Sequence, residues 1–391
     1  FINDAKEESV NTILEMAEYK KTGSCKVLVV TGCMAQRYKN EIIEEVPEVD
    51  AVLGTTSYGD ILKAIREAME GKHFQEFKDI DYLPEKLGKR VLTTGGHFGY
   101  LKIAEGCDKH CTYCIIPKLR GKFRSVPMER LVTQAKEMAE EGVKELILVA
   151  QETTVYGTDI YGKKSLHILL KELCKIKGIR WIRVLYCYPE EIYDELIQTM
   201  KEEKKICHYL DLPIQHASDR ILKRMGRRTT QAELVEIVNK LRREIPDIVL
   251  RTTLISGFPG ETQEDHEELM GFVDEMEFDR LGVFTYSPEE DTPAATMPDQ
   301  VAEEVKEARR DEIMELQQEI SYDKGTDRIG QELLVMIEGK VADESAYIGR
   351  TYGDAPKVDG YIFVQTGELL MTGDFAKVRV TGALEYDLIE I

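Results

Sequence analysis

The 391-residue chain lacks the features that mark membrane-spanning and secreted proteins. It has no run of about 18 apolar residues, so we expect no membrane span. It has no charged-then-apolar leader, so nothing indicates secretion and we expect a cytoplasmic protein. Cysteine is scarce, because eight residues are too few for a disulfide scaffold in a chain of this length. Clustered cysteines in such a chain more often bind a metal or take part in catalysis.

Positive charge is also in short supply. Lys and Arg together number 52, against 72 Asp and Glu, which gives a formal net charge of −20. This balance argues against broad, sequence-blind contact with nucleic acid, although it leaves room for a local basic groove. Hydrophobic residues make up 42% and charged residues 32%, as in ordinary globular proteins.

Patterns along the chain predict three domains joined by one linker. Residues 1–75 alternate strand and helix patterns, which predicts an α/β domain with a parallel sheet. Residues 76–96 lose this rhythm and are interpreted as a linker. Residues 97–324 are predicted to form a partial (βα)6 barrel, and residues 325–391 a small all-β barrel of the oligonucleotide-binding type. The strands expected in the larger barrel are 100–105, 146–151, 182–187, 209–214, 250–257 and 280–286.

The most specific pattern is a triplet of cysteines, Cys107, Cys111 and Cys114, directly after the first barrel strand. Active sites of βα barrels lie at the carboxyl ends of the strands. Three thiolates can hold a 4Fe-4S cluster and leave one iron open, which could chelate the amine and carboxylate of S-adenosylmethionine. Two alternatives remain: three unrelated core cysteines, or a zinc site completed by His110.

Around this triplet the sequence resembles the radical S-adenosylmethionine methylthiotransferases. The resemblance rests on Tyr100–Cys107, Cys111–Pro117, Arg120-Gly121 and Arg124-Ser125, and it extends over essentially the whole chain. It implies an N-terminal α/β domain, a radical core and a C-terminal TRAM barrel. It also implies a 4Fe-4S cluster on the triplet and S-adenosylmethionine as cofactors, with no catalytic side chain beyond the cluster.

Polar residues near the strand ends are expected to bind S-adenosylmethionine. By resemblance, Gln151 and Glu152 bind its amino group, unless Thr153 or Thr154 merely caps a helix there. Gln215 and His216 could contact the nucleoside or the substrate, although a lone histidine is often a structural hydrogen-bonding residue.

Four further positions complete the expected cofactor site. Arg251 could face the methionine carboxylate, with a surface salt bridge as the alternative. Ile255, Gly257 and Phe258 belong to a glycine-rich strand-to-helix turn, where the backbone can approach a ligand closely and the apolar side chains could flank the adenine. Tyr113 resembles the family's adenine-flanking aromatic residue.

The resemblance also implies a second 4Fe-4S cluster, held by three cysteines of the N-terminal domain. The third of these corresponds to Cys33 in the segment Thr31–Gln36, and the other two are absent. In relatives the second lies just upstream of a segment that resembles Phe1–Asp4. We therefore expect an N-terminally truncated chain whose intact form binds two clusters. Cys33 could instead be a free core thiol. Cys174, Cys187 and Cys207 are interpreted as core residues, and Cys25 is unassigned.

Charge and sequence both bear on the substrate, since the family modifies either a transfer RNA adenosine or an aspartate of a ribosomal protein. Residues 326–391 contain twelve Asp and Glu against six Lys and Arg, which favours docking of a basic ribosomal protein over RNA. Ala355–Gly360 and Glu385–Leu388 also resemble the aspartate-modifying branch.

The predicted function is insertion of a methylthio group at the β-carbon of an aspartate in a small-subunit ribosomal protein of the decoding centre. An unactivated C–H bond offers no acidic proton, which is why radical chemistry is needed. A reductase or other electron donor is expected as a partner, and nucleic acid is not. The alternatives are a transfer RNA adenosine methylthiotransferase and a non-catalytic zinc-binding adaptor.

Overall fold

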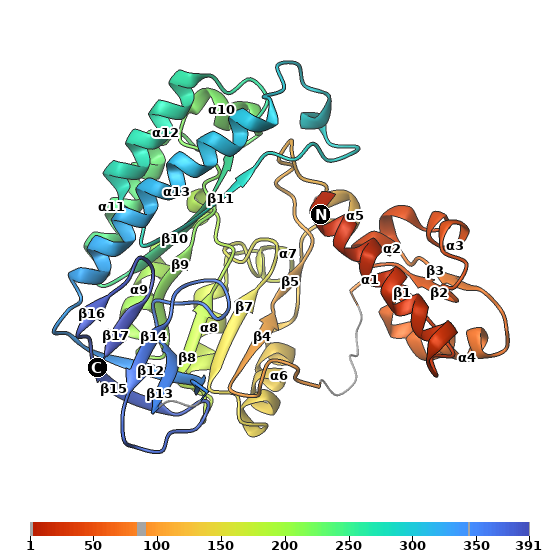
Figure 1. Ribbon diagram of the computed structural model, residues 1–391, viewed down its shortest axis with the longest axis horizontal. Coiled ribbons are helices and arrows are strands. Elements are labelled where there is room, and N and C mark those ends of the chain that lie inside the picture. Colours follow the sequence, from red (N-terminus) through yellow and green to blue (C-terminus); the bar gives the residue numbers. More distant parts are fainter. Residues whose placement is uncertain (1–2, 84–90, 343–344, 391) are drawn as a thin grey trace. The chain divides into compact units, whose positions relative to one another are not determined.

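The computed structural model describes residues 3–83, 91–342 and 345–390. The chain divides into two compact units (Figure 1). Unit 1 comprises residues 1–91, 105–124 and 287–297, and unit 2 comprises residues 92–104, 125–286 and 298–391. Phe1, Ile2 and residues 84–90 of the expected linker lie outside the described residues. Among the described helices, none combines the length and apolar composition needed to cross a bilayer.

Unit 1 contains the predicted parallel α/β layer. Its sheet has the order β1-β2-β3, and Val30 pairs with Val52 in parallel register. Val30, Ala51, Val52 and Leu53 form its buried apolar faces. The elements are α1 (Asn3–Thr22), β1 (Val29–Thr31), α2 (Cys33–Tyr38), α3 (Glu41–Glu45), β2 (Ala51–Leu53), α4 (Ile61–Met69), β3 (Phe74–Glu76) and α5 (Ile116–Arg120), with a 3-10 turn at Tyr58–Asp60.

Two expectations for this region need correction. The predicted linker begins at residue 76, but that residue ends β3, a strand too short to show a period-2 pattern. The apolar pattern of residues 1–75 also predicts one helix over 36–45, but the structure divides it, because Lys39 adopts a φ of 44° and ends α2 before α3 begins.

Unit 2 is built on the predicted open sheet of six parallel strands, in the order β11-β10-β9-β8-β7-β4. This confirms the partial (βα)6 barrel. Its strands are β4 (Phe98–Lys102), β7 (Glu145–Val149), β8 (Trp181–Val184), β9 (Ile206–Asp211), β10 (Val249–Ser256) and β11 (Arg280–Thr285). Two short strands, β5 (Ala104–Glu105) and β6 (Arg124–Ser125), stand where the chain passes from one unit to the other.

The helices of unit 2 form where the sequence has helix caps and apolar residues at helical spacing. Helix α11 begins with a capping box between Thr230 and Glu233, and it buries Leu234, Val238 and Leu241 at helical spacing. The long helix α13 packs along β10 and β11 beside α12 (Figure 1). The helices are α6 (Met128–Glu140), α7 (Thr158–Tyr161), α8 (Leu166–Cys174), α9 (Asp194–Glu202), α10 (Asp219–Arg224), α11 (Gln231–Glu244), α12 (Gln263–Met276) and α13 (Glu303–Thr326), with 3-10 turns at Pro189–Glu191 and, in unit 1, Pro293–Thr296.

The C-terminal part of unit 2 is the expected small β domain. Its curled sheet has the order β15-β12-β13-β14-β17-β16 around a core that includes Val335, Ile337, Ile362 and Val378. All its pairs are antiparallel except β14 with β17. The strands are β12 (Glu332–Lys340), β13 (Ala346–Arg350), β14 (Ile362–Gln365), β15 (Phe375–Arg379), β16 (Gly382–Ala383) and β17 (Leu388–Glu390).

The β domain packs against the amino ends of the barrel strands. Trp181, the first residue of β8, meets the ring of Phe375 edge-on at 4.9 Å between centroids. Met336 and Ala355 of the β domain share one buried cluster with Trp181. The carboxyl ends of β7, β9 and β10, which Gln151, Gln215 and Gly257 follow, therefore lie at the opposite end of the sheet.

Candidate functional site

The cysteine triplet lies in a loop of unit 1 between β5 and α5. Cys107 and Cys111 are 7% and 5% exposed, and Cys114 is half-buried. None of the chain's cysteines forms a disulfide. The loop is tied to itself by the Cys107 amide, which donates to the Gly121 carbonyl at 3.2 Å, and by the Cys114 amide, which donates to the Cys111 carbonyl at 3.1 Å. The sequence thus brings three thiols together in one short, anchored loop.

Two residues with left-handed backbone shape this loop. Gly106 has a φ of 79°, and a Cβ added there would overlap the carbonyls of Gly121 and Lys122, so only glycine fits. His110 has a φ of 54°. On its far side the loop is held by the amide of Ala294, which donates to the carbonyl of Thr112 at 2.9 Å.

The donor set of the loop suits an iron–sulfur cluster, because it consists of three thiols with no disulfide between them. Within the residues that the structure describes, no three His, Cys, Asp or Glu side chains are already arranged to hold a metal ion. His110, the fourth ligand of the alternative zinc site, is exposed.

Cys33 lies apart from the triplet loop in sequence but within the same unit. It is the first residue of α2 and is half-buried rather than a core thiol. The Arg120 Nε donates to its sulfur at 3.2 Å, and Arg120 also pairs with Glu105 at 3.4 Å. One thiol does not suffice for a four-iron cluster, so the residues present here do not fit a second cluster by themselves.

The predicted cofactor residues Gln151 and Glu152 follow β7 in unit 2. Glu152 is 1% exposed and accepts a hydrogen bond from the Thr154 amide at 3.0 Å. The alternative that Thr153 or Thr154 caps a helix is wrong, because the next helix begins only at Thr158 and its N-cap is Gly157. Thr153 instead donates its hydroxyl to the carbonyl of Leu185 at 2.8 Å, which joins the ends of β7 and β8.

Gln215 and His216 follow β9, but they differ in setting. Gln215 has a φ of 73° and bridges to β10, where the Ile255 amide donates to its carbonyl at 2.8 Å. His216 is fully buried, and its Nδ1 accepts from the Ser218 amide at 3.0 Å. The proton therefore lies on Nε2, which faces Glu261 at 3.5 Å. His216 is thus buried and hydrogen-bonded to the backbone of its own turn.

Glu261 organises the glycine-rich turn after β10. Its Oε2 accepts from the amides of Gly257 and Phe258 at 2.8 and 3.1 Å, and its Oε1 pairs with Arg309 at 2.9 Å. Burial by itself would raise the pKa of Glu261, but His216 and Arg309 outweigh it and hold the pKa below its ordinary value.

The apolar residues of the turn are less available than expected. Phe258 has no exposed surface and packs against Tyr286 at 5.2 Å between ring centroids. The Phe258 ring would have to move before it could contact an adenine, because packing in the core covers it. The sequence had suggested an accessible ring. Ile255 remains half-buried, and Gly257 keeps a φ of 70°. Tyr113, predicted to flank the same adenine, is half-buried in the loop of unit 1.

Arg251 is already engaged by two carboxylates. Its Nη1 donates to Asp211 at 2.7 Å, and its Nε lies 3.4 Å from Asp359 of the β domain. Its side chain is 18% exposed, so this is a largely buried network rather than a surface salt bridge. Binding of a methionine carboxylate by Arg251 would require these pairs to break or rearrange.

A second buried network links the sheet to the β domain. Glu145 accepts from Arg183 at 2.7 Å through one oxygen and from Arg350 at 2.7 Å through the other, and all three side chains are 0% exposed. Burial alone would raise the pKa of Glu145, but the two guanidinium groups outweigh it and lower the pKa. Sequence patterns gave no sign of this network, because its members are far apart along the chain.

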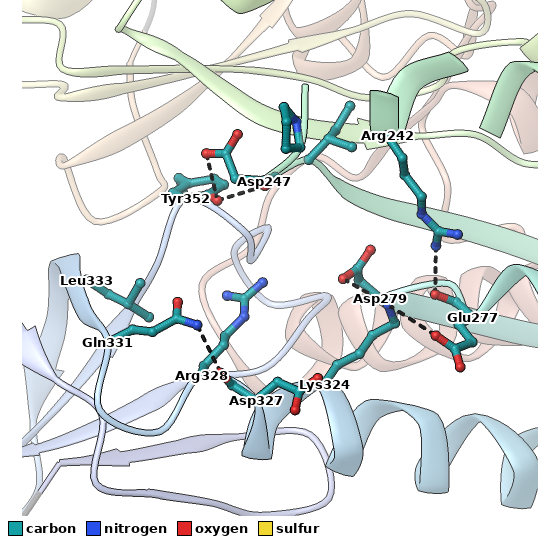
Figure 2. A pocket seen from close by; sticks show the side chains of 12 residues that line it. Arg242, Asp247, Glu277, Asp279, Lys324, Asp327, Arg328, Gln331, Leu333 and Tyr352 are labelled. Atoms are coloured by element: carbon teal, nitrogen blue, oxygen red, sulfur yellow. Dashed lines mark hydrogen bonds and ion pairs between the residues drawn. The ribbon is translucent and has the colours of Figure 1, made fainter. Parts of the chain in front are cut away.

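The cavity in Figure 2 lies at the amino ends of β10 and β11, whereas Gln151, Gln215 and Gly257 follow the carboxyl ends of their strands. It measures about 540 Å³, and its lining includes Asp247 and Asp279, which come just before β10 and β11. Arg242 donates to the Glu277 carbonyl and Tyr352 to Asp247, so much of its polar lining is already paired. Its position at the amino ends of the strands separates it from the edge where barrel enzymes react.

Burial predicts which thiols react slowly. It raises the pKa of both Cys174 and Cys207 to about 12, and raises that of Cys187 further. We expect iodoacetamide to modify Cys207 and Cys187 in the folded, metal-free chain at least about a hundredfold more slowly than Cys25, because the thiolate is the reacting species. Peptide mass mapping measures this, with guanidinium-unfolded chain as the control. Equal rates in the folded chain would show that these cysteines are not core residues.

Comparison with known proteins identifies three family regions. Residues 101–273 match the radical SAM superfamily, residues 329–390 match the TRAM domain, and residues 1–54 match the uncharacterized protein family UPF0004. Among solved structures, the cobalamin-dependent S-adenosylmethionine radical enzyme OxsB aligns with a TM-score of 0.48 at 15% identity, over 81% of this chain and 46% of that one.

Curated relatives match along the full length of the chain. The ribosomal protein uS12 methylthiotransferase RimO of Lachnoclostridium phytofermentans is 66% identical over 389 residues, which cover 100% of this chain and 88% of the relative. The proteins of the same name from Clostridium perfringens and Clostridioides difficile are 53% and 50% identical, covering 100% of this chain and 87% of each relative. The chain therefore belongs to the family of the ribosomal protein uS12 methylthiotransferases, radical S-adenosylmethionine enzymes with a TRAM domain.

Proposed function

We propose that this enzyme holds a 4Fe-4S cluster through Cys107, Cys111 and Cys114 and binds S-adenosylmethionine at the open iron. The observation that carries this proposal is the loop of three thiols, free of disulfides and anchored by its own backbone. When bound, the cluster and S-adenosylmethionine supply an electron and a carbon radical that can take hydrogen from an unactivated C–H bond.

The chain's own residues would orient the cofactor and exclude water. Gln151 and Gln215, which follow β7 and β9 on either side of β8, are the polar groups we assign to S-adenosylmethionine, together with the buried Glu152. The Gly257 backbone is fixed by Glu261, so it offers a preorganised edge for the nucleoside. His216 contributes indirectly, by holding Glu261.

We infer that the substrate is the ribosomal protein uS12 and that the methylthio group is added to the β-carbon of one of its aspartates. The relatives' shared name and the high identity over the whole chain support the substrate. A ribosomal substrate supports a cytoplasmic location for the enzyme. An electron donor protein has to reduce the cluster, and we propose that the TRAM domain docks the substrate.

The charge of the TRAM domain supports docking less strongly than its composition suggested. Glu338, Asp354 and Asp359 are largely buried and paired with Arg350, Arg280 and Arg251. Arg280 and Arg251 belong to the barrel, so Asp354 and Asp359 stabilise the contact between the TRAM domain and the barrel. Asp343 and Glu344 lie outside the described residues. The remaining exposed surface is closer to charge balance, and the substrate assignment rests on the relatives.

The test is product analysis after anaerobic incubation of the intact, cluster-loaded enzyme with reductant and S-adenosylmethionine. Purified uS12 and unmodified transfer RNA are supplied in parallel reactions and examined by mass spectrometry. We expect the added mass of one methylthio group on an aspartate peptide of uS12 and none on transfer RNA. Modification of transfer RNA alone would replace the proposed substrate with the adenosine of the other branch.

A further inference from the structure

Tyr186 is a large aromatic residue in an unusual backbone conformation, and it lies just after the carboxyl end of β8. It comes two residues after the end of β8 and has a φ of 59°, in the left-handed region that non-glycine residues seldom adopt. Strained residues of this kind cluster at active sites and ligand clamps, where the surrounding structure fixes them.

Neighbouring strands hold the Tyr186 backbone from both sides. Its amide donates to Asp211 Oδ2 at 3.1 Å, at the end of β9. Its carbonyl accepts from the amide and the hydroxyl of Thr153, which follows β7, at 3.1 and 3.0 Å. Asp211 is 3% exposed and Thr153 is fully buried. Buried polar groups of two other chain segments thus maintain the left-handed conformation.

The Tyr186 side chain is accessible to a binding partner. The Tyr186 ring is 48% exposed, whereas Glu152 and His216 at the same edge are 1% and 0% exposed. Within the part of the chain that the structure describes, its hydroxyl makes no hydrogen bond. Burial of the ring's inner side, together with Asp211, raises the pKa of the phenol, so the hydroxyl stays protonated and able to donate at neutral pH.

We propose that Tyr186 contacts the protein substrate, its hydroxyl donating a hydrogen bond to an oxygen of the segment that carries the target aspartate. Tyrosine suits this task, because it offers a rigid apolar ring and a polar tip and is enriched where proteins bind one another. The inference rests on the proposed function.

Two substitutions separate the hydroxyl from the ring. Tyr186→Phe removes only the hydroxyl. Tyr186→Gly removes the whole side chain and suits a φ of 59°, so its backbone is not strained. Tyr322→Phe is the matched control, because Tyr322 lies on α13 and is also 48% exposed. For each intact, cluster-loaded enzyme, two rates are measured: methylthiolation against uS12 concentration, and 5′-deoxyadenosine release without uS12.

We expect Tyr186→Phe to raise the KM for uS12 about tenfold, as loss of one hydrogen bond to an oxygen acceptor does. Tyr186→Gly should raise it further, and both should leave 5′-deoxyadenosine release without uS12 unchanged. An unchanged KM in Tyr186→Phe overturns the proposal, and so does an equal rise in Tyr322→Phe. Loss of 5′-deoxyadenosine release without uS12 also overturns it, since Tyr186 would then serve the cofactor.

If the Tyr186→Gly variant does not fold, the KM of the Tyr186→Phe variant alone tests the proposal. Absence of product from the unsubstituted enzyme contradicts the proposed function instead.

Discussion

The Cys111→Ala variant is expected to lose the triplet's cluster and with it all reductive cleavage of S-adenosylmethionine. Two thiolates cannot hold a 4Fe-4S cluster that needs three and an open iron, so bound iron at this site should fall from about four per chain to near zero. Cys111 is 5% exposed, and its carbonyl accepts the Cys114 amide, a bond that alanine keeps. The loop backbone should therefore survive the substitution.

The measurement is iron and sulfide content together with 5′-deoxyadenosine release under reducing, anaerobic conditions. Cys174→Ala is the matched control, because Cys174 is a half-buried thiol at the end of α8 outside the triplet. It should keep its iron and its cleavage activity. If Cys111→Ala releases 5′-deoxyadenosine at a rate comparable to the control, Cys111 is not a ligand of the reacting cluster.

The Arg350→Met variant is expected to lose about 3–5 kcal/mol of stability, the usual result of removing one partner from a buried ion network. The substitution leaves Glu145 Oε2 without its 2.7 Å partner in a fully buried position. It also removes the 2.7 Å pair between Arg350 and Glu338. Because the pair of Arg350 with Glu145 joins the TRAM domain to the barrel, we expect the contact between these two domains to loosen first.

Denaturant unfolding followed by tryptophan fluorescence measures this loss of stability where the barrel meets the TRAM domain. Trp181 is the chain's single tryptophan, is 6% exposed and packs on Phe375 at the same join. Its emission should shift to the red at lower denaturant in Arg350→Met. Lys377→Met is the control, because the pair of Lys377 with Glu332 is exposed and contributes at most about 1 kcal/mol. Equal midpoints for Arg350→Met and the unsubstituted chain would show that the network contributes little.

Much of the fold could be predicted because its elements have strong local patterns. The apolar strands and amphipathic helices of the barrel, such as α11 with its capping box, are long enough to be recognised. Strand β3 has only three residues, so it showed no interpretable pattern in the sequence. Register and strand order depend on contacts between distant residues and could not be derived from one sequence.

Some residues of the candidate site could be predicted from the sequence and others could not. The cysteine triplet could be predicted, because its three members are close in sequence. His216 and Phe258 were singled out by type, but folding buried both of them, one against Glu261 and the other in the core. Tyr186 was missed, since its significance lies in a backbone angle that only Asp211 and Thr153 explain. Composition likewise could not show that Asp354 and Asp359 are paired with barrel arginines.

The most direct test of the central claim is electron paramagnetic resonance of the anaerobically reconstituted, reduced chain before and after addition of S-adenosylmethionine. If Cys107, Cys111 and Cys114 leave one iron open, the reduced cluster's spectrum should change on addition of S-adenosylmethionine, and the chain should contain about four irons at this site. A spectrum that S-adenosylmethionine leaves unchanged, or a colourless chain containing zinc, would contradict the account.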